Sequence, residues 1–227
     1  RFRNQFLHFM WIRSRILGNQ YRSFNKGYPT KRGFYINMPL KSFGAITKTT
    51  HKVGCRKFLF FGFIQDYKRL DLFIHAAKQI GNAQFVIAGA CNEWEKYEKI
   101  IGQMDNLQCN IHFLKNDEII LYFQEADYLV LPYDESTQSG PLLIAYNYNI
   151  PVIASDIELF KTMVCDKQNG FLFEKGNLSS LIKILDDANN LPESQYQLLV
   201  KNMSKRKEQY QSTTNFKLAL DTFLGKR

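Results

Sequence analysis

The sequence predicts an α/β protein with a doubly wound, parallel, Rossmann-like sheet. From Lys57 onward, short apolar runs alternate with helix-length amphipathic segments, a pattern typical of a parallel sheet with helices on both faces. The apolar runs are continuous rather than alternating, as expected for strands that are buried on both sides. The chain has 227 residues, of which 45% are hydrophobic, which is enough for one full domain core and part of another.

The expected elements follow one another without a long interruption. Leu72, Phe73, Ala76 and Ile80 fall on one face of the first expected helix, which predicts that this helix packs on the sheet. In chain order we expect strands over residues 57–63, 84–89, 110–114, 127–133, 151–155 and 170–174, and helices over residues 69–80, 92–104, 117–126, 157–164 and 177–189. A further helix is expected to begin within residues 133–146, and one or two more after Pro192.

The composition divides the chain near residues 44–54. Residues 1–65 contain Lys and Arg but no Asp or Glu, so the net charge of +9 belongs to this end. We predict that residues 1–50 are the remnant of an N-terminal domain with its connector, and that residues 51–227 form the Rossmann-like domain. The connector is expected at NMPLKSFG, where Pro and Gly interrupt the pattern. The first residue is Arg rather than Met, so we expect a fragment or a processed chain.

The N-terminal segment RFRNQFLHFMWIRSRIL mixes Arg with large apolar residues. Two interpretations stay open: a helix that lies on an anionic membrane surface, and a helix separated from a missing N-terminal domain. Nucleic acid is not an expected partner, because no nucleic-acid-binding motif accompanies the segment. No apolar run reaches the roughly 20 residues of a membrane span. We therefore expect a cytoplasmic protein, peripheral at most to the inner face of the membrane.

The cysteines and histidines indicate neither a disulfide framework nor a metal site. The four Cys are scattered without a close pair, which favours reduced thiols in a cytoplasmic protein. The four His residues have no metal-like spacing, and His112 is expected to be packed within a strand. Neither a metal nor a resident cofactor is expected.

The topology predicts that Lys68 faces the segment Ser136–Gly140. In a six-stranded doubly wound sheet the usual strand order is 3-2-1-4-5-6, and the ligand crevice opens where the winding reverses, at the carboxyl ends of strands 1 and 4. Lys68 lies in the loop after the first strand, and the small polar residues 136–140 follow the fourth strand and precede a helix. Free backbone N–H groups at a helix start form an anion site, so a diphosphate is the expected ligand.

The alternative is a purely structural role, in which Ser136 or Thr137 only caps this helix, as small polar residues often do. The adjacent Asp134 and Glu135 are expected to compensate the helix dipole rather than to accept hydrogen bonds from sugar hydroxyls, because carboxylates close to a phosphate repel it.

Five segments resemble the C-terminal half of family 4 (group 1) glycosyltransferases of the GT-B type. They are FLFFGFIQDYKRLDLFIHAA, FVIAG, HFLKNDEIILYFQEADYLVLPY, TQSGPLLIAYNYNIPVIASD and NGFLFEKGNLSSLIKIL, and the resemblance covers roughly residues 37–185 in order. It implies two Rossmann-like domains with the nucleotide-sugar donor held mostly by the C-terminal one. It also implies retaining, metal-independent transfer of a sugar to a glycan or lipid-linked acceptor.

The resemblance also assigns site residues. Lys68 matches the family lysine on the diphosphate, in a loop opened by Gly62, and is the residue we expect to be catalytic. Thr137, Gln138, Ser139 and Gly140 match a subset of the family with Thr-Gln-Ser-Gly, in which backbone groups of the last three hold the phosphate. Leu114, Lys115 and Asn116 match the loop whose backbone meets the base.

The sequence departs from the family pattern at the phosphate clamp. Phe63 stands where the family usually has Arg, and Arg69, in place of a Gly after the lysine, puts a displaced guanidinium nearby. The family's pair of Glu residues falls on Ser136 and Ile144. Unless Arg69 substitutes for it, the missing clamp arginine removes on the order of several kcal/mol of leaving-group stabilisation. The alternative function is therefore a non-catalytic nucleotide-binding or interaction module, or a degenerate transferase.

Overall fold

A computed structural model of the chain describes residues 40–49 and 51–211. The amphipathic segment at residues 1–17 and most of the expected N-terminal remnant lie outside these residues. The compact unit considered below spans Leu40–Lys207. Within the described ranges, no helix combines the length and the apolar character that crossing a membrane requires.

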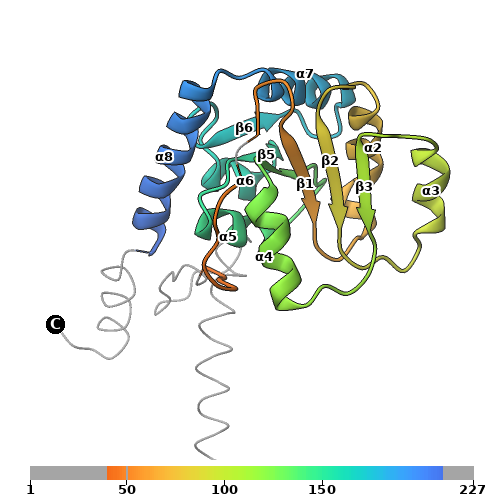
Figure 1. Ribbon diagram of the computed structural model, residues 1–227, viewed down its shortest axis with the longest axis horizontal. Helices are drawn as coiled ribbons and strands as arrows, with labels where there is room; N and C mark the ends of the chain where they lie inside the picture. Colours follow the sequence, from red (N-terminus) through yellow and green to blue (C-terminus); the bar gives the residue numbers. More distant parts are fainter. Residues whose placement is uncertain (1–39, 50, 212–227) are drawn as a thin grey trace, which may run out of the picture. The chain divides into compact units, whose positions relative to one another are not determined.

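The centre of this unit is a six-stranded parallel sheet (Figure 1). Its strands run in the order β3-β2-β1-β4-β5-β6, and every neighbouring pair is parallel. The predicted fold class and strand order are confirmed, so the winding reverses between β1 and β4. The strands are β1 (Lys57–Phe61), β2 (Gln84–Ala88), β3 (Leu107–Asn110), β4 (Tyr128–Leu131), β5 (Val152–Ser155) and β6 (Gly170–Phe173).

Helices connect successive strands and cover both faces of the sheet, as right-handed crossovers require. They are the short 3-10 helix η1 (Asp66–Lys68), α2 (Leu70–Ala77), α3 (Glu95–Ile101), α4 (Asn116–Glu125), α5 (Gly140–Asn147), α6 (Glu158–Met163), α7 (Leu178–Asn189) and α8 (Glu193–Gln211). In Figure 1, α4 lies in front of the sheet and α2 lies behind it.

The two core layers can be followed along β1, whose side chains point alternately to opposite faces. Phe58 and Phe60 belong to the core that α2 and α7 cover. Leu59 and Phe61 belong to the other core, into which α4, α5 and α6 pack. All four side chains are nearly inaccessible to solvent. This double burial explains why the strand is a continuous apolar run, and it fixes where the loop after β1 begins.

The third strand was placed wrongly from the sequence. We expected it at residues 110–114, but β3 is Leu107–Asn110. This strand lies at the edge of the sheet and its two central residues are exposed, so it needs no continuous apolar run. The more apolar residues 111–114 instead form the connection to α4, where Phe113 is 84% exposed.

Candidate functional site

The loops that follow β1 and β4 meet at the carboxyl end of the sheet. The backbone N–H of Asp134 donates a hydrogen bond to the carbonyl oxygen of Tyr67 at 2.8 Å. The ring of Tyr67 packs edge-on against the ring of Tyr133, with 5.7 Å between the centroids. The predicted juxtaposition of these two loops is therefore confirmed, and the crevice of a doubly wound sheet opens between them.

Lys68 ends the short helix η1 and is a buried cation without a hydrogen-bond partner. Its side chain is 7% exposed, and it makes no hydrogen bond or ion pair with any residue that the structure describes. Its ammonium lies 5.5 Å from the centre of the Tyr133 ring, a weak cation–π contact. Burial lowers the pKa of Lys68 from 10.5 to about 8. A buried ammonium of this kind is stabilised by a bound anion.

The start of α5 offers backbone donors. Ser139 is the residue that caps the helix, and its hydroxyl oxygen accepts a hydrogen bond from the N–H of Leu142 at 3.3 Å. The expected alternative of a cap at Ser136 or Thr137 is wrong, because the helix begins later. Within the described chain, the backbone N–H groups of Ser139 and Gly140 have no hydrogen-bond acceptor. They are the donors that a helix start presents to an anion.

Lys68 and the first turn of α5 share the space in front of Gly62. A methyl group on Gly62 would lie 3.4 Å from Nζ of Lys68 and 3.4 Å from Cγ of Pro141. Gly62 also has a φ of 108°, which side chains rarely adopt. A glycine here leaves the space open between the ammonium and the helix start. Three segments that are distant in the sequence thus form one candidate anion site.

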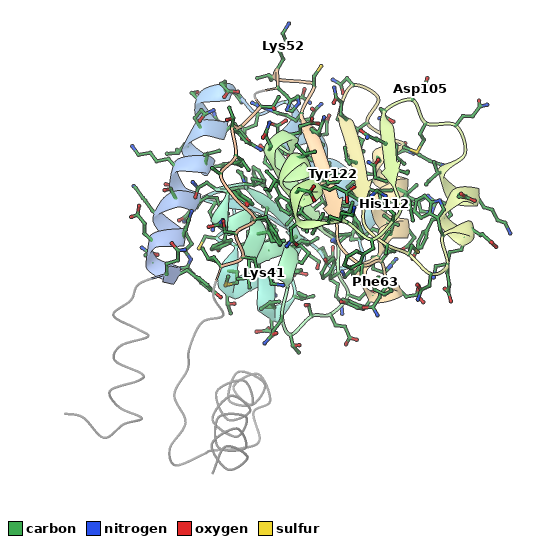
Figure 2. The ribbon with its side chains drawn as sticks, turned by 60° about the horizontal axis from the view of Figure 1, so that its bottom comes forward. Lys41, Lys52, Phe63, Asp105, His112 and Tyr122 are labelled. Atoms are coloured by element: carbon green, nitrogen blue, oxygen red, sulfur yellow. The ribbon has the colours of Figure 1, made fainter. Side chains whose placement is uncertain are left out.

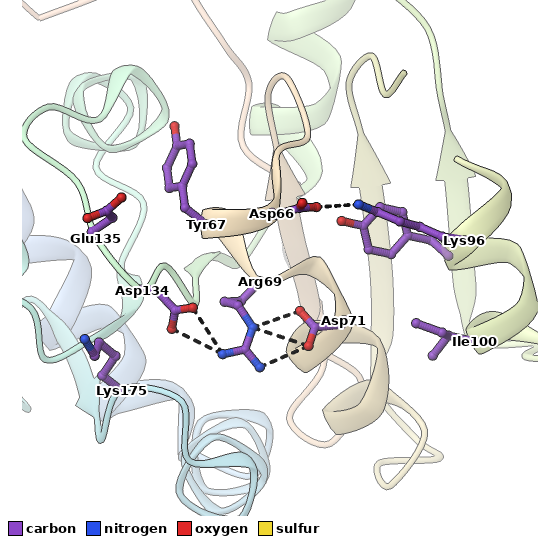
Figure 3. A pocket seen from close by; sticks show the side chains of 10 residues that line it. Asp66, Tyr67, Arg69, Asp71, Lys96, Ile100, Asp134, Glu135 and Lys175 are labelled. Carbon is purple, nitrogen blue, oxygen red and sulfur yellow. Dashed lines mark hydrogen bonds and ion pairs between the residues drawn. The ribbon is translucent and has the colours of Figure 1, made fainter. Parts of the chain in front are cut away.

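Arg69 is close to this site, but its guanidinium pairs with two carboxylates (Figure 3). Its Nη1 is 3.2 Å from Asp134 Oδ1, and its Nη2 is 3.0 Å from Asp71 Oδ2. Asp134 therefore pairs with Arg69, a role that neither of the two expected alternatives included. All three line a pocket of about 600 Å³ that neither Lys68 nor Ser139 lines. The backbone of Arg69 is left-handed, with a φ of 51°.

The remaining predicted site residues lie on the same two loops and at the start of α4. Thr137 and Gln138 are exposed just before α5. Leu114 is buried in the core on the α5 side of the sheet. Lys115 and Asn116 begin α4, where the N–H of Lys115 donates to Glu118. Within the described chain, no hydrogen bond or ion pair links Lys115 or Asn116 to Lys68 or to the start of α5.

Sequence reasoning missed one aromatic residue and misplaced one histidine. Tyr133 lies directly under the ammonium of Lys68 and is buried. Its position as the second residue after β4, at the predicted reversal of winding, could have indicated this contact. His112 is not packed within a strand. Its side chain, which is labelled in Figure 2, is half exposed, and its Nε2 lies 2.9 Å from Glu118 Oε1.

A doubly wound parallel sheet with a candidate anion site where its winding reverses has the architecture of a Rossmann-like domain. Residues 55–188 match the family of glycosyl transferases group 1, and this match covers more than half of the chain. The chain belongs to this family, as the resemblance implied.

Two curated relatives agree with this assignment. An uncharacterized glycosyltransferase from Haemophilus influenzae is 25% identical over 155 residues, 65% of this chain and 43% of the relative. The alpha-monoglucosyldiacylglycerol synthase of Acholeplasma laidlawii is 27% identical over 126 residues, 55% of this chain and 31% of the relative. The chain thus spans less than half the length of either relative.

Solved glycosyltransferase structures share the fold, and this chain covers a C-terminal-like half of them. The C-terminal domain of the group 1 family protein LpcC from Francisella tularensis has a TM-score of 0.57 and 20% identity, covering 66% of this chain and 83% of that one. A TarM variant from S. aureus, in complex with fondaparinux, α-GlcNAc-glycerol and UDP, has a TM-score of 0.71 and 18% identity, covering 86% of this chain and 40% of that one.

Proposed function

We propose that the chain is the donor-binding half of a glycosyltransferase that transfers a sugar from a nucleotide-sugar donor to a glycan or lipid-linked acceptor. The observation that carries this proposal is the buried, unpaired ammonium of Lys68, which shares the space in front of Gly62 with the first turn of α5. An N-terminal domain and a membrane surface are the further partners in this proposal.

The chemistry follows from where charge develops. When the bond between the anomeric carbon and the diphosphate oxygen breaks, its electron pair stays on the diphosphate. Lys68 and the N–H groups of Ser139 and Gly140 would face this oxygen or its neighbours. Donors that are already oriented stabilise the leaving group without reorganising during the reaction. Gln138, Thr137 and the loop at Leu114–Asn116 would complete the donor site, the latter against the base.

Two finer parts of the proposal rest on the family resemblance. Metal-independent transfer is consistent with a diphosphate site built from an ammonium and backbone donors. Retention of the anomeric configuration rests on the resemblance alone.

A non-catalytic nucleotide-binding module is the second candidate. Phe63, which replaces the usual clamp arginine, is 46% exposed and supplies no charge. Arg69 is held by two carboxylates. Both features weaken the stabilisation of a leaving group, but they leave binding possible. Assays of transfer, rather than of binding, separate the two candidates.

The direct test is calorimetric titration of the 227-residue chain with uridine, adenosine and guanosine diphosphates. We expect Lys68→Ala to weaken binding of the preferred nucleotide by about 1.5–3 kcal/mol, the range for a hydrogen bond to a charged group. Lys78→Ala, which changes an exposed lysine at the end of α2, is the matched control. Equal affinities of the Lys68→Ala and Lys78→Ala variants would refute the site, and multi-turnover transfer by this chain alone would refute the donor-half assignment.

A further inference from the structure

The proposed diphosphate site has fewer cations than its ligand needs. A diphosphate ester carries about two negative charges at neutral pH. Proteins usually bind such a ligand with more than one positively charged group. Lys68 supplies one. Phe63 supplies none, and the guanidinium of Arg69 already has Asp71 and Asp134 as counter-ions. A second cation close to the site would bring its charge nearer to that of the ligand.

Lys41, in the connector that precedes the sheet, lies beside the start of α5. A methyl group on Gly140, the first residue of α5, would be 3.5 Å from Nζ of Lys41. Lys41 is exposed (Figure 2), and it forms no hydrogen bond or ion pair with the residues described. Its ammonium and the ammonium of Lys68 thus approach the same first helical turn from two different segments.

The connector is held in place beside α5 by Tyr148, the residue that follows this helix. The N–H of Phe43 donates to the hydroxyl of Tyr148 at 2.8 Å, and this hydroxyl donates to the carbonyl oxygen of Gly44 at 3.1 Å. Leu40 and Phe43 pack against the core on the α5 side. Since the residues on both sides of Lys41 are anchored, its backbone position is determined by the fold.

Two ammonium groups at the amino end of a helix are an unfavourable arrangement without a counter-ion. This end of a helix carries a partial positive charge, so cations there are repelled and anions are attracted. The arrangement becomes favourable when an anion lies between the groups. We propose that Lys41 is the second cation of the diphosphate site, a binding residue that contacts the donor phosphates together with Lys68. This inference rests on the proposed function.

The experiment compares the affinity of four chains for inorganic pyrophosphate and for uridine diphosphate at fixed ionic strength. They are the wild type and the variants Lys41→Ala, Lys41→Arg and Lys52→Ala. Lys52 is another exposed lysine of the connector region and serves as the matched control. We expect Lys41→Ala to weaken binding of both ligands about tenfold, Lys41→Arg to keep most of the affinity, and Lys52→Ala to resemble the wild type.

The outcomes separate this inference from the proposed function. The role of Lys41 is refuted if Lys41→Ala binds both ligands as tightly as the wild type does, or if Lys41→Arg binds them as weakly as Lys41→Ala does. If Lys68→Ala still binds weakly in that case, the donor site stands. If Lys52→Ala weakens binding as much as Lys41→Ala does, the effect is one of general surface charge and the inference is also refuted. If the wild type binds neither pyrophosphate nor any nucleoside diphosphate, both proposals fail. Thermal midpoints measured without ligand should not fall in any of the three variants, because the side chain of neither Lys41 nor Lys52 has a hydrogen-bond or ion-pair partner among the described residues.

Discussion

The guanidinium of Arg69 lies 3.2 Å from the carboxylate of Asp134 and joins the loop after β1 to the loop after β4. The same guanidinium contacts Asp71 at the start of α2. These contacts direct the side chain along the α2 side of the crevice, although its backbone follows directly after Lys68. Arg69 therefore connects the two loops, and it lines a pocket that Lys68 does not line.

Replacements of Arg69 should separate backbone strain from the ion pairs. The residue has a left-handed backbone with a φ of 51°, a conformation that costs most residues about 1 kcal/mol relative to Gly. Arg69→Gly should therefore be more stable than Arg69→Ala by about 1 kcal/mol in urea denaturation, since both lose the same partly exposed ion pairs. Neither variant should change diphosphate affinity by more than about twofold. A loss of affinity comparable to that of Lys68→Ala would show that Arg69 leaves its carboxylates to bind the ligand.

Lys68→Met should stabilise the protein while it weakens ligand binding. Burial lowers the pKa of Lys68 in the folded state from 10.5 to about 8, so the folded protein holds this proton less tightly than the unfolded chain does. Stability therefore increases as the pH rises through this window, and the full penalty is present below it. At neutral pH we expect a gain of about 1–3 kcal/mol in the free energy of unfolding. Thermal denaturation with and without nucleoside diphosphate measures both effects.

Diphosphate binding should weaken in alkaline solution. The ammonium of free Lys68 loses its proton near a pKa of about 8, and only the charged form attracts the phosphates. Above this pH the dissociation constant should rise by up to about tenfold per pH unit. The phosphates themselves are fully ionised in this range, and their charge does not change. Lys68→Arg, which stays charged, should remove this pH dependence, and an unchanged slope in that variant would assign the titration to another group.

Gly89→Ala should destabilise the carboxyl end of the sheet. The first side-chain carbon at Gly89 would lie 2.2 Å from the carbonyl oxygen of Gly62, and the φ of 145° is itself unfavourable for alanine. We expect a loss of about 2–4 kcal/mol in the free energy of unfolding. Gly81→Ala, where nothing lies within 4 Å of the new carbon and φ is ordinary, should be nearly neutral. Equal stability of these two variants would contradict the close approach of Gly62 and Gly89.

The sequence predicted the features that depend on order along the chain. The alternation of apolar and amphipathic segments determines the order of the strands, and this order brings Lys68 toward the residues before α5. The same reasoning predicted that the helix start with Ser139 lies in the candidate site, whereas Gly62 was assigned by the family resemblance.

The features that were missed depend on contacts between distant residues. Lys41 and Gly140 meet although nothing in the connector pattern distinguishes Lys41 from other lysines. Arg69 is directed away by Asp134, whose partner could not be inferred from neighbouring residues. The third strand was misplaced because an edge strand tolerates exposed polar residues such as Gln108, so an apolar pattern does not identify it.

The narrowest junction of the sheet lies directly beneath the candidate site. Between β1 and β4 two residue pairs are in register, Phe58 with Tyr128 and Leu59 with Leu129, whereas β1 and β2 share five. A diphosphate held by Lys68 on one side and by α5 on the other would connect the two halves of the sheet across this junction. Saturating ligand should therefore slow amide hydrogen exchange at Asp127, whose N–H donates to the carbonyl oxygen of Lys57 across this junction, because local opening between the two halves of the sheet would require the ligand to leave first.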